Sequence, residues 1–127
     1  MKGNGDVAAR WLKLAESDFA GAEVLVTNNT NLQGACFHCQ QAAEKSLKAW
    51  LIAHDTPFPK EHDLERVIEL CASLAPGFKE LSTEAMALTP YAVKLRYDST
   101  FWPSIDEARI ALEQARRIYQ FVKDHWN

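Results

Sequence analysis

The sequence is poor in the features that mark secreted and membrane-spanning proteins. It has only three cysteines among 127 residues. This small, odd number does not suit a disulfide framework and favours a reducing compartment, so we expect a cytoplasmic protein. No apolar run approaches the roughly 20 residues that a membrane span requires. The first ten residues also lack the apolar centre of a signal peptide.

The chain has no excess of positive charge either. Its 14 basic and 17 acidic residues give a net charge of -3. Because nucleic-acid affinity rests on clustered lysine and arginine, any contact with nucleic acid must be confined to a local patch. Hydrophobic residues make up 47% and charged residues 24% of the chain, as in ordinary globular proteins. We therefore expect one domain over residues 1–127 that folds without a cofactor.

Hydrophobic periodicity predicts helices and no strands. Apolar residues spaced by three and four positions predict long helices over residues 7–27, 32–53, 64–75 and from residue 105 onward. The segment 78–95 keeps helical phase through Pro90, which predicts a kink near Thr89 or two stacked short helices. The fold class that follows is an all-α, antiparallel up-and-down bundle of four to five helices.

Polar residues mark where these helices begin. Asp6, Asn31 and Asp63 are candidate N-caps of the first three helices. Ser104-Ile105-Asp106-Glu107 has the Ser-x-x-Glu spacing of a capping box and predicts the start of the last helix. Pro57 and Pro59 predict that the segment from 54 to 62 is a loop.

The segment Cys36-Phe37-His38-Cys39 contains half of a common zinc-binding pattern. A closed zinc site needs four ligands, and the sequence has no second Cys-x-x-Cys pair. Cys36 and Cys39 fall on the apolar stripe of the helix over 32–53, and Cys71 stands alone. We interpret all three as small core side chains rather than metal ligands or nucleophiles, and we expect no metal site.

The same helix carries a polar stripe of Gln41, Glu44, Lys45 and Lys48. Gln41 with Lys45, and Glu44 with Lys48, have the i,i+4 spacing that stabilises an exposed helix by about a few tenths of a kcal/mol per pair. An exposed helix surface is therefore one interpretation. The other is that this face docks a partner helix or lines a cleft shared by two chains.

The segment from Leu95 to Pro103 interrupts the helical pattern with three aromatic residues and an arginine. Arg96 has the planar guanidinium that clamps a phosphate, and Tyr97 has a ring that can stack on a base. A purely structural alternative is an ion pair between Arg96 and Asp98, with Trp102 packed on the bundle. The sequence leaves both alternatives open.

Four segments, taken in order, resemble the HEPN family. They are Asp18-Phe19-x-x-Ala22, Phe37-His38-Cys39-Gln40-Gln41-Ala42-Ala43-Glu44-Lys45-Ser46-Leu47-Lys48-Ala49, His62-Asp63-Leu64 and Leu95-Arg96-Tyr97. The second is the most specific, and together they cover nearly the whole chain. The resemblance implies a helical bundle that commonly dimerises, often pairs with a minimal nucleotidyltransferase in a toxin-antitoxin type of system, and binds nucleotides or acts on RNA.

Nuclease members of this family commonly carry an arginine, four to six further residues and then a histidine. Counted from Arg96, the positions for that histidine hold Phe101, Trp102 and Pro103, so the motif is not intact. This departure favours a binding module. Its implied partners are a second copy of the chain, a separate minimal nucleotidyltransferase and a nucleotide or RNA.

In that binding module, the candidate phosphate- and nucleotide-binding residues are Arg96, Tyr97 and Lys45. Phe37, Gln41 and Glu44 are candidates for packing or for a dimer cleft.

Two alternatives use the same residues differently. The first is a metal-independent ribonuclease toxin, in which Arg96 acts with a histidine from outside the motif, His38 or His62, as the general base. The second is a purely structural dimerisation scaffold.

Overall fold

The computed structural model describes residues 3–58, 60 and 62–127. In chain order, its elements are α1 (Gly3–Thr27), α2 (Leu32–Ala53), α3 (Leu64–Leu74), the 3-10 helix η1 (Pro76–Leu81), α4 (Ser82–Leu88), α5 (Tyr91–Tyr97) and α6 (Ile105–Asp124). No strand occurs in these ranges. The all-α bundle predicted from periodicity is confirmed.

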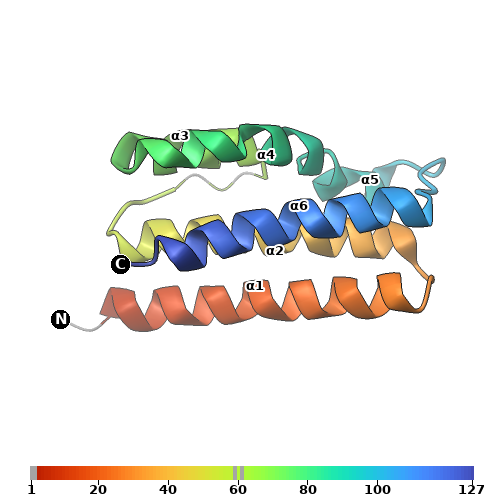
Figure 1. Cartoon of the computed structure of the whole chain (residues 1–127), viewed down its shortest axis with the longest axis horizontal. Coiled ribbons are helices and arrows are strands. Elements are labelled where there is room, and N and C mark those ends of the chain that lie inside the picture. The colour runs from red at the N-terminus through yellow and green to blue at the C-terminus, as the bar shows by residue number, and fades with distance from the viewer. Residues whose placement is uncertain (1–2, 59, 61) are drawn as a thin grey trace.

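The three longest helices lie side by side, and the shorter α3 and α4 lie on the side of α2 and α6 that faces away from α1 (Figure 1). α1 and α2 run antiparallel, and α6 returns along the same pair toward the end where α1 begins. α3 and α4 form a further layer, while α5 and the loop after it lie at the end of the bundle where α2 and α6 begin. This topology places the chain segment 95–104 beside the first turns of α2.

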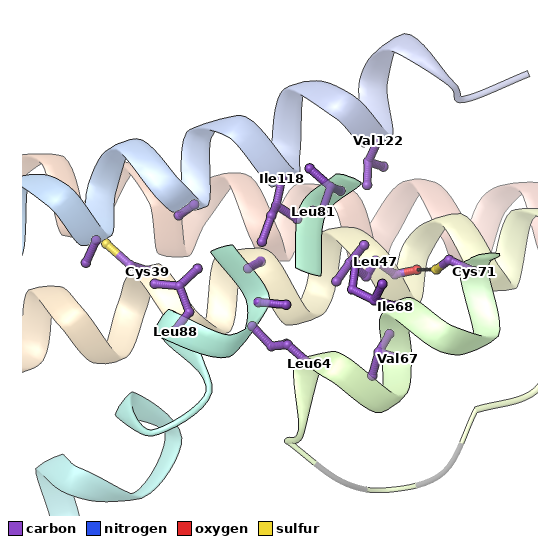
Figure 2. Packing of buried hydrophobic residues seen from close by; sticks show 14 of the residues in the cluster. Cys39, Leu47, Leu64, Val67, Ile68, Cys71, Leu81, Leu88, Ile118 and Val122 are labelled. Atoms are coloured by element: carbon purple, nitrogen blue, oxygen red, sulfur yellow. Dashed lines mark hydrogen bonds between the residues drawn. The ribbon is translucent and has the colours of Figure 1, made fainter. Parts of the chain in front are cut away.

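α2 is the central helix, because it contacts α1, α3, α4, α5 and α6. Its predicted apolar stripe is buried, including Cys36, Cys39 and Leu47. Figure 2 shows Leu47 pointing toward Ile68 and Cys71 of α3. The core therefore forms where the helix layers meet on α2.

Three of the four predicted helix caps are confirmed. The Asn31 side chain accepts a hydrogen bond from the Gly34 amide at 3.2 Å, and the Asp63 side chain accepts one from the Glu65 amide at 3.0 Å. Ser104 and Glu107 form both hydrogen bonds of the capping box. The prediction for Asp6 is wrong, since α1 already begins at Gly3 and Asp6 lies in its first turn. There its carboxylate still favours the helix through the macrodipole.

The predicted break near Thr89 separates two short helices, α4 and α5. Pro90 has no amide hydrogen to continue the ladder of α4. The Thr89 hydroxyl donates to the Ala85 carbonyl at 2.8 Å and accepts from the Leu64 amide at 3.1 Å. The break is therefore fastened to the start of α3. The 3-10 turn at Pro76–Leu81 was not predicted; it replaces the first turn of the expected helix over 78–95.

The buried face of α6 is made mainly of small side chains. Leu112 and Tyr119 also have apolar spacing on this helix, but both are only half-buried. The fully buried positions are Ala108, Ala111, Ala115, Ile118 and Val122. Small side chains at three of these positions let α6 approach α2 closely. Among the described residues, no helix is long and apolar enough to cross a membrane.

Truncation of Leu47 tests the central position of α2. Leu47 has no exposed surface, whereas Leu14 on α1 is 51% exposed. We expect Leu47→Ala to lower the free energy of unfolding by about 2–5 kcal/mol, because it removes buried contacts and leaves a cavity. Leu14→Ala is the matched control and should change it by less than about 0.5 kcal/mol. Urea denaturation followed by circular dichroism measures both, and equal effects would contradict this description of the core.

Candidate functional site

Arg96 and Tyr97 lie in the last turn of α5 and face solvent. The Arg96 guanidinium carbon lies 5.8 Å from the centre of the Phe37 ring on α2, a cation-π arrangement. Tyr97 is 77% exposed. Both residues are on the surface at the end of the bundle, and Phe37 supports the arginine from below.

The structural alternative for this segment is wrong on both counts. Asp98 makes no ion pair with Arg96; its side chain accepts hydrogen bonds from the Thr100 amide at 2.9 Å and the Thr100 hydroxyl at 2.6 Å. These bonds lower the pKa of Asp98. Trp102 is 75% exposed and does not pack on the bundle. Within the described part of the chain, Arg96 thus has an aromatic contact and no carboxylate partner.

Asp18 of α1 joins two cationic or titratable side chains of α2. Its Oδ1 lies 2.8 Å from His38 Nδ1, and its Oδ2 lies 2.7 Å from Lys45 Nζ. His38 and Lys45 are seven residues apart, which is two helical turns and puts them on one face of α2. The Asp18 side chain is 12% exposed, so this pairing is mostly removed from solvent.

The contact with Asp18 orients the His38 ring. A carboxylate only accepts hydrogen bonds, so Nδ1 carries the proton and Nε2 is the free acceptor of the neutral ring. The ring also lies against α1 at Gly21, where an added Cβ would sit 3.9 Å from its Cδ2. The His38 side chain is 38% exposed. An aspartate that holds one nitrogen of a partly exposed imidazole, and leaves the other as an acceptor, is an arrangement that general bases use.

Phe37 links the two parts of the surface. Its ring lies beneath Arg96 and 5.9 Å from the His38 ring, edge to face. A continuous path of contacts therefore runs from Arg96 through Phe37 and His38 to Asp18 and then Lys45. We call these five residues the α1-α2-α5 surface. Asp18 was not among the predicted site residues, because its role depends on contacts that span 20 and 27 positions.

Glu44 does not belong to this surface. It is 4% exposed and accepts hydrogen bonds from Gln40 Nε2 at 2.9 Å, His62 Nδ1 at 2.8 Å and Lys48 Nζ at 3.0 Å. The interpretation of this stripe as an exposed helix surface is therefore wrong for Glu44 and Lys48. Both are buried within their own chain, so neither lies open to a second chain as a docking face.

The buried network fastens the loop before α3 onto α2. Gln40 also donates to the His62 carbonyl at 3.3 Å, and Gln41 donates to Gln40 Oε1 at 2.7 Å. Lys48 lies 4.9 Å from the centre of the Phe58 ring. His62 is thus held by Glu44, while His38 is held by Asp18. Of the two candidate histidines, only His38 is connected to Arg96, through Phe37.

The three cysteines are core side chains, as predicted. Cys36, Cys39 and Cys71 have no exposed surface. Burial raises the pKa of Cys36 to about 11 and the pKa values of Cys39 and Cys71 to about 12. Neutral thiols facing the core are poor nucleophiles and poor metal ligands. In the residues that the structure describes, no group of three or more cysteine, histidine or acidic side chains is arranged to hold a metal ion.

A family model for the HEPN domain matches residues 8–125. The chain belongs to the HEPN domain family. The match extends over nearly all of the helical bundle and is therefore not confined to one motif.

Solved structures share this fold. TT1696 from Thermus thermophilus is 27% identical, with a TM-score of 0.77 over 92% of this chain and 96% of that one. ST0689, an archaeal HEPN homologue, is 23% identical, with a TM-score of 0.74 over 94% of this chain and 98% of that one, and shows similarity of fold. A comparison with curated proteins found no match.

The segment that resembles HEPN proteins most specifically, residues 37–49, lies entirely on the central helix of this HEPN domain. Its Gln40, Glu44 and Lys48 supply the buried network, while His38 and Lys45 reach the α1-α2-α5 surface. The polar residues of this helix therefore divide into an inner set that holds a loop and an outer set that faces α1.

Removal of Lys48 tests the buried network. Lys48→Met keeps much of the side-chain volume but takes one ionic partner from the buried Glu44 carboxylate. We expect the free energy of unfolding to fall by roughly 3–5 kcal/mol, the usual cost of breaking a buried ion pair from one side. Lys13→Met, at an exposed position of α1, is the control and should have little effect. A cost for Lys48→Met no larger than that of the control would contradict the network.

Thiol titration tests the burial of the cysteines. With pKa values of about 11 to 12, almost no thiolate exists at about pH 8 in the folded chain. We expect a chromogenic disulfide reagent to label none of the three thiols within minutes in the native protein, and all three in concentrated guanidinium chloride. Rapid labelling of one thiol without denaturant would show that it is open to solvent and ionisable.

Proposed function

We propose that this HEPN domain is a binding module that holds a nucleotide or an RNA phosphate with Arg96, assisted by Tyr97. The observation that carries the proposal is the state of Arg96, which is exposed, rests on the Phe37 ring and has no carboxylate partner among the described residues. An anion can therefore approach the guanidinium without displacing an ion pair. Arginine presents a planar fork of donors that matches phosphate.

Tyr97 supplies the second element of the proposed site. It follows Arg96 directly and is 77% exposed. A solvent-facing ring next to a phosphate-binding cation suits stacking on a base, which contributes about 1–3 kcal/mol per base in single-stranded complexes. The pair thus offers one contact to the phosphate and one to the base of the same nucleotide.

Lys45 has a secondary part in this proposal. Its ammonium is already 2.7 Å from Asp18, so much of its charge is balanced within the chain. An ammonium has three donors, and the Asp18 contact uses one of them. Lys45 can add a hydrogen bond to a ligand that extends along the α1-α2-α5 surface, but it provides little net attraction.

The proposal includes two protein partners, a second copy of the chain and a separate minimal nucleotidyltransferase. Membership of the HEPN domain family supports both partners. The second copy is also supported by Phe37 and Gln41, which are only half-buried and leave part of each side chain for a dimer cleft. Glu44 drops out of that cleft because its carboxylate is buried in its own chain. The toxin-antitoxin type of pairing belongs to the same proposal.

A metal-independent ribonuclease is the second candidate, and the Asp18–His38 contact is the observation that favours it. His38 Nε2 would take the proton of a 2′-hydroxyl, and Arg96 would stabilise the charge that develops on the phosphate. His38 lies outside the spacing of arginine, four to six residues and histidine that nuclease members carry, but it is joined to Arg96 through Phe37.

Calorimetric titration with nucleoside monophosphates and short RNAs tests the binding module. We expect Arg96→Ala to weaken binding by about tenfold or more, because a charge-assisted hydrogen bond contributes roughly 1.5–3 kcal/mol. Arg109→Ala is the matched control: its side chain is 64% exposed on α6 and makes only a 3.8 Å pair with Asp106. Undiminished binding by Arg96→Ala, or no binding by the wild type, would defeat the assignment.

The same preparations separate the alternatives. Incubation with RNA in a chelating buffer should leave the RNA intact if the module only binds. Cleavage that is lost in both His38→Ala and Asp18→Asn, and kept in His62→Ala, would establish the ribonuclease instead. If the wild type neither binds nor cleaves RNA, and Arg96→Ala changes only the melting temperature, the arginine is structural and the chain is a scaffold.

A further inference from the structure

Trp102 is a large hydrophobic residue whose side chain is exposed to solvent. It is 75% exposed, whereas the other large exposed aromatic, Tyr97, carries a polar hydroxyl. Burial of a large apolar side chain favours folding, so a tryptophan left in water does not contribute that stabilisation. Isolated exposed leucines are ordinary. A tryptophan held at a fixed exposed position is instead a candidate contact for a ligand, because its ring has a large apolar face.

The neighbours of Trp102 fix this orientation. Residues 101–104 form no helix, and burial alternates along them: Phe101 is half-buried, Trp102 is exposed and Pro103 is buried. The Phe101 ring stacks on Tyr91 with centroids 5.6 Å apart. The residues on both sides of Trp102 thus pack on the bundle, and they hold the Trp102 side chain toward solvent.

The turn before Trp102 is also fastened. Asp98 binds the amide and hydroxyl of Thr100, and the Asp98 carbonyl accepts from the Phe101 amide at 3.2 Å. Tyr97 and Trp102 stand at the two ends of this turn. The two most exposed aromatic rings among the described residues therefore belong to one braced segment, and ordering them on binding costs little conformational entropy.

The charges around the segment identify the kind of occupant. Lys94 and Arg96 lie in the last turn of α5, each over an aromatic ring, Phe101 at 5.4 Å and Phe37 at 5.8 Å. Neither makes an ion pair within the described part of the chain. Asp98 is the one acid of this turn. Its carboxylate accepts hydrogen bonds from Thr100 and also interacts electrostatically with Lys94, which leaves Arg96 as the cation with the least compensated charge. Cations interleaved with exposed rings attract an anion that has aromatic faces.

We propose that Trp102 is a second stacking platform and that the ligand is a single-stranded RNA of two or more nucleotides rather than a mononucleotide. One base stacks on Tyr97 and another on Trp102, and Arg96 and Lys94 contact the phosphates between and beside them. A small pocket of about 160 Å³ lined by Gln33, Lys94 and Trp102, among others, lies next to the indole. This inference rests on the proposed function and specifies its ligand.

Fluorescence titration tests it with three probes: uridine monophosphate, the dinucleotide UpU and a uridine hexanucleotide, at low salt. Of the four tryptophans, Trp50 is buried and Trp11 and Trp126 are half-buried, so quenching by the RNA reports mainly on Trp102. We expect the hexanucleotide to bind at least about tenfold more tightly than the monophosphate. Trp102→Ala removes this fluorescent reporter, so its affinities are measured by calorimetric titration. The variant should lose about tenfold of the hexanucleotide affinity and bind the monophosphate unchanged.

Two variants sharpen the test, with anisotropy of a labelled hexanucleotide as the readout. Trp102→Phe keeps a ring and should bind within about threefold of the wild type, because stacking needs an aromatic face and not the indole itself. Leu14→Ala removes another solvent-facing apolar side chain, from α1, and should change nothing. Since Trp102 lies on the surface, thermal melts should show all three variants folded.

The outcomes separate this inference from the function on which it rests. If the wild type binds RNA and Trp102→Ala binds it equally well, the second platform is wrong and the proposed function stands. If the wild type binds none of the three probes, both are wrong. If Trp102→Ala dissociates a dimer seen by light scattering and leaves hexanucleotide affinity unaltered, the indole is a protein contact and the inference is overturned.

Discussion

The burial of α2 on nearly every side is the constraint on which this fold depends. A helix that contacts five others cannot keep a polar stripe in solvent, so the carboxylate of Glu44 must be paired inside the protein. Gln40, Lys48 and His62 supply that pairing, and His62 brings with it the loop that leads to α3. The charged residues in the middle of α2 thus serve the fold, because they hold the α3 layer against the long helices.

The same constraint limits where a binding surface can form. Between residues 34 and 51, the partly exposed positions of α2 are Phe37 and His38 near its start, and Gln41 and Lys45 further along. α5 ends over the first of these, and its last turn places Arg96 on the Phe37 ring. A surface made by three helices is rigid, and the loop it supports carries exposed rings at a fixed orientation. Rigid elements that present a braced loop are the usual setting of a binding site.

Local physics predicted much of the fold and little of the site. The caps at Asn31, Asp63 and Ser104 and the break at Thr89 follow from side chains a few residues away, and sequence reasoning found them. The partners of Asp18 and the His62 partner of Glu44 lie 18 to 27 residues distant, so their pairing depends on how helices pack, which periodicity does not specify. A buried Glu44 and an exposed Glu44 have the same i,i+4 relation to Lys48. The sequence therefore identified the right helix and assigned part of it to the wrong environment.

Charge balance then decides what kind of recognition this surface supports. Lys45 and His38 face Asp18, so the inner part of the α1-α2-α5 surface carries little net charge. Arg96 and Lys94 remain as the cations without carboxylate partners among the described residues of that end, in a chain whose net charge is -3. Two phosphate contacts give only a modest, salt-sensitive attraction. Affinity for a strand must then come from base stacking, which salt screens little, and the exposed rings of Tyr97 and Trp102 are the groups placed to provide it.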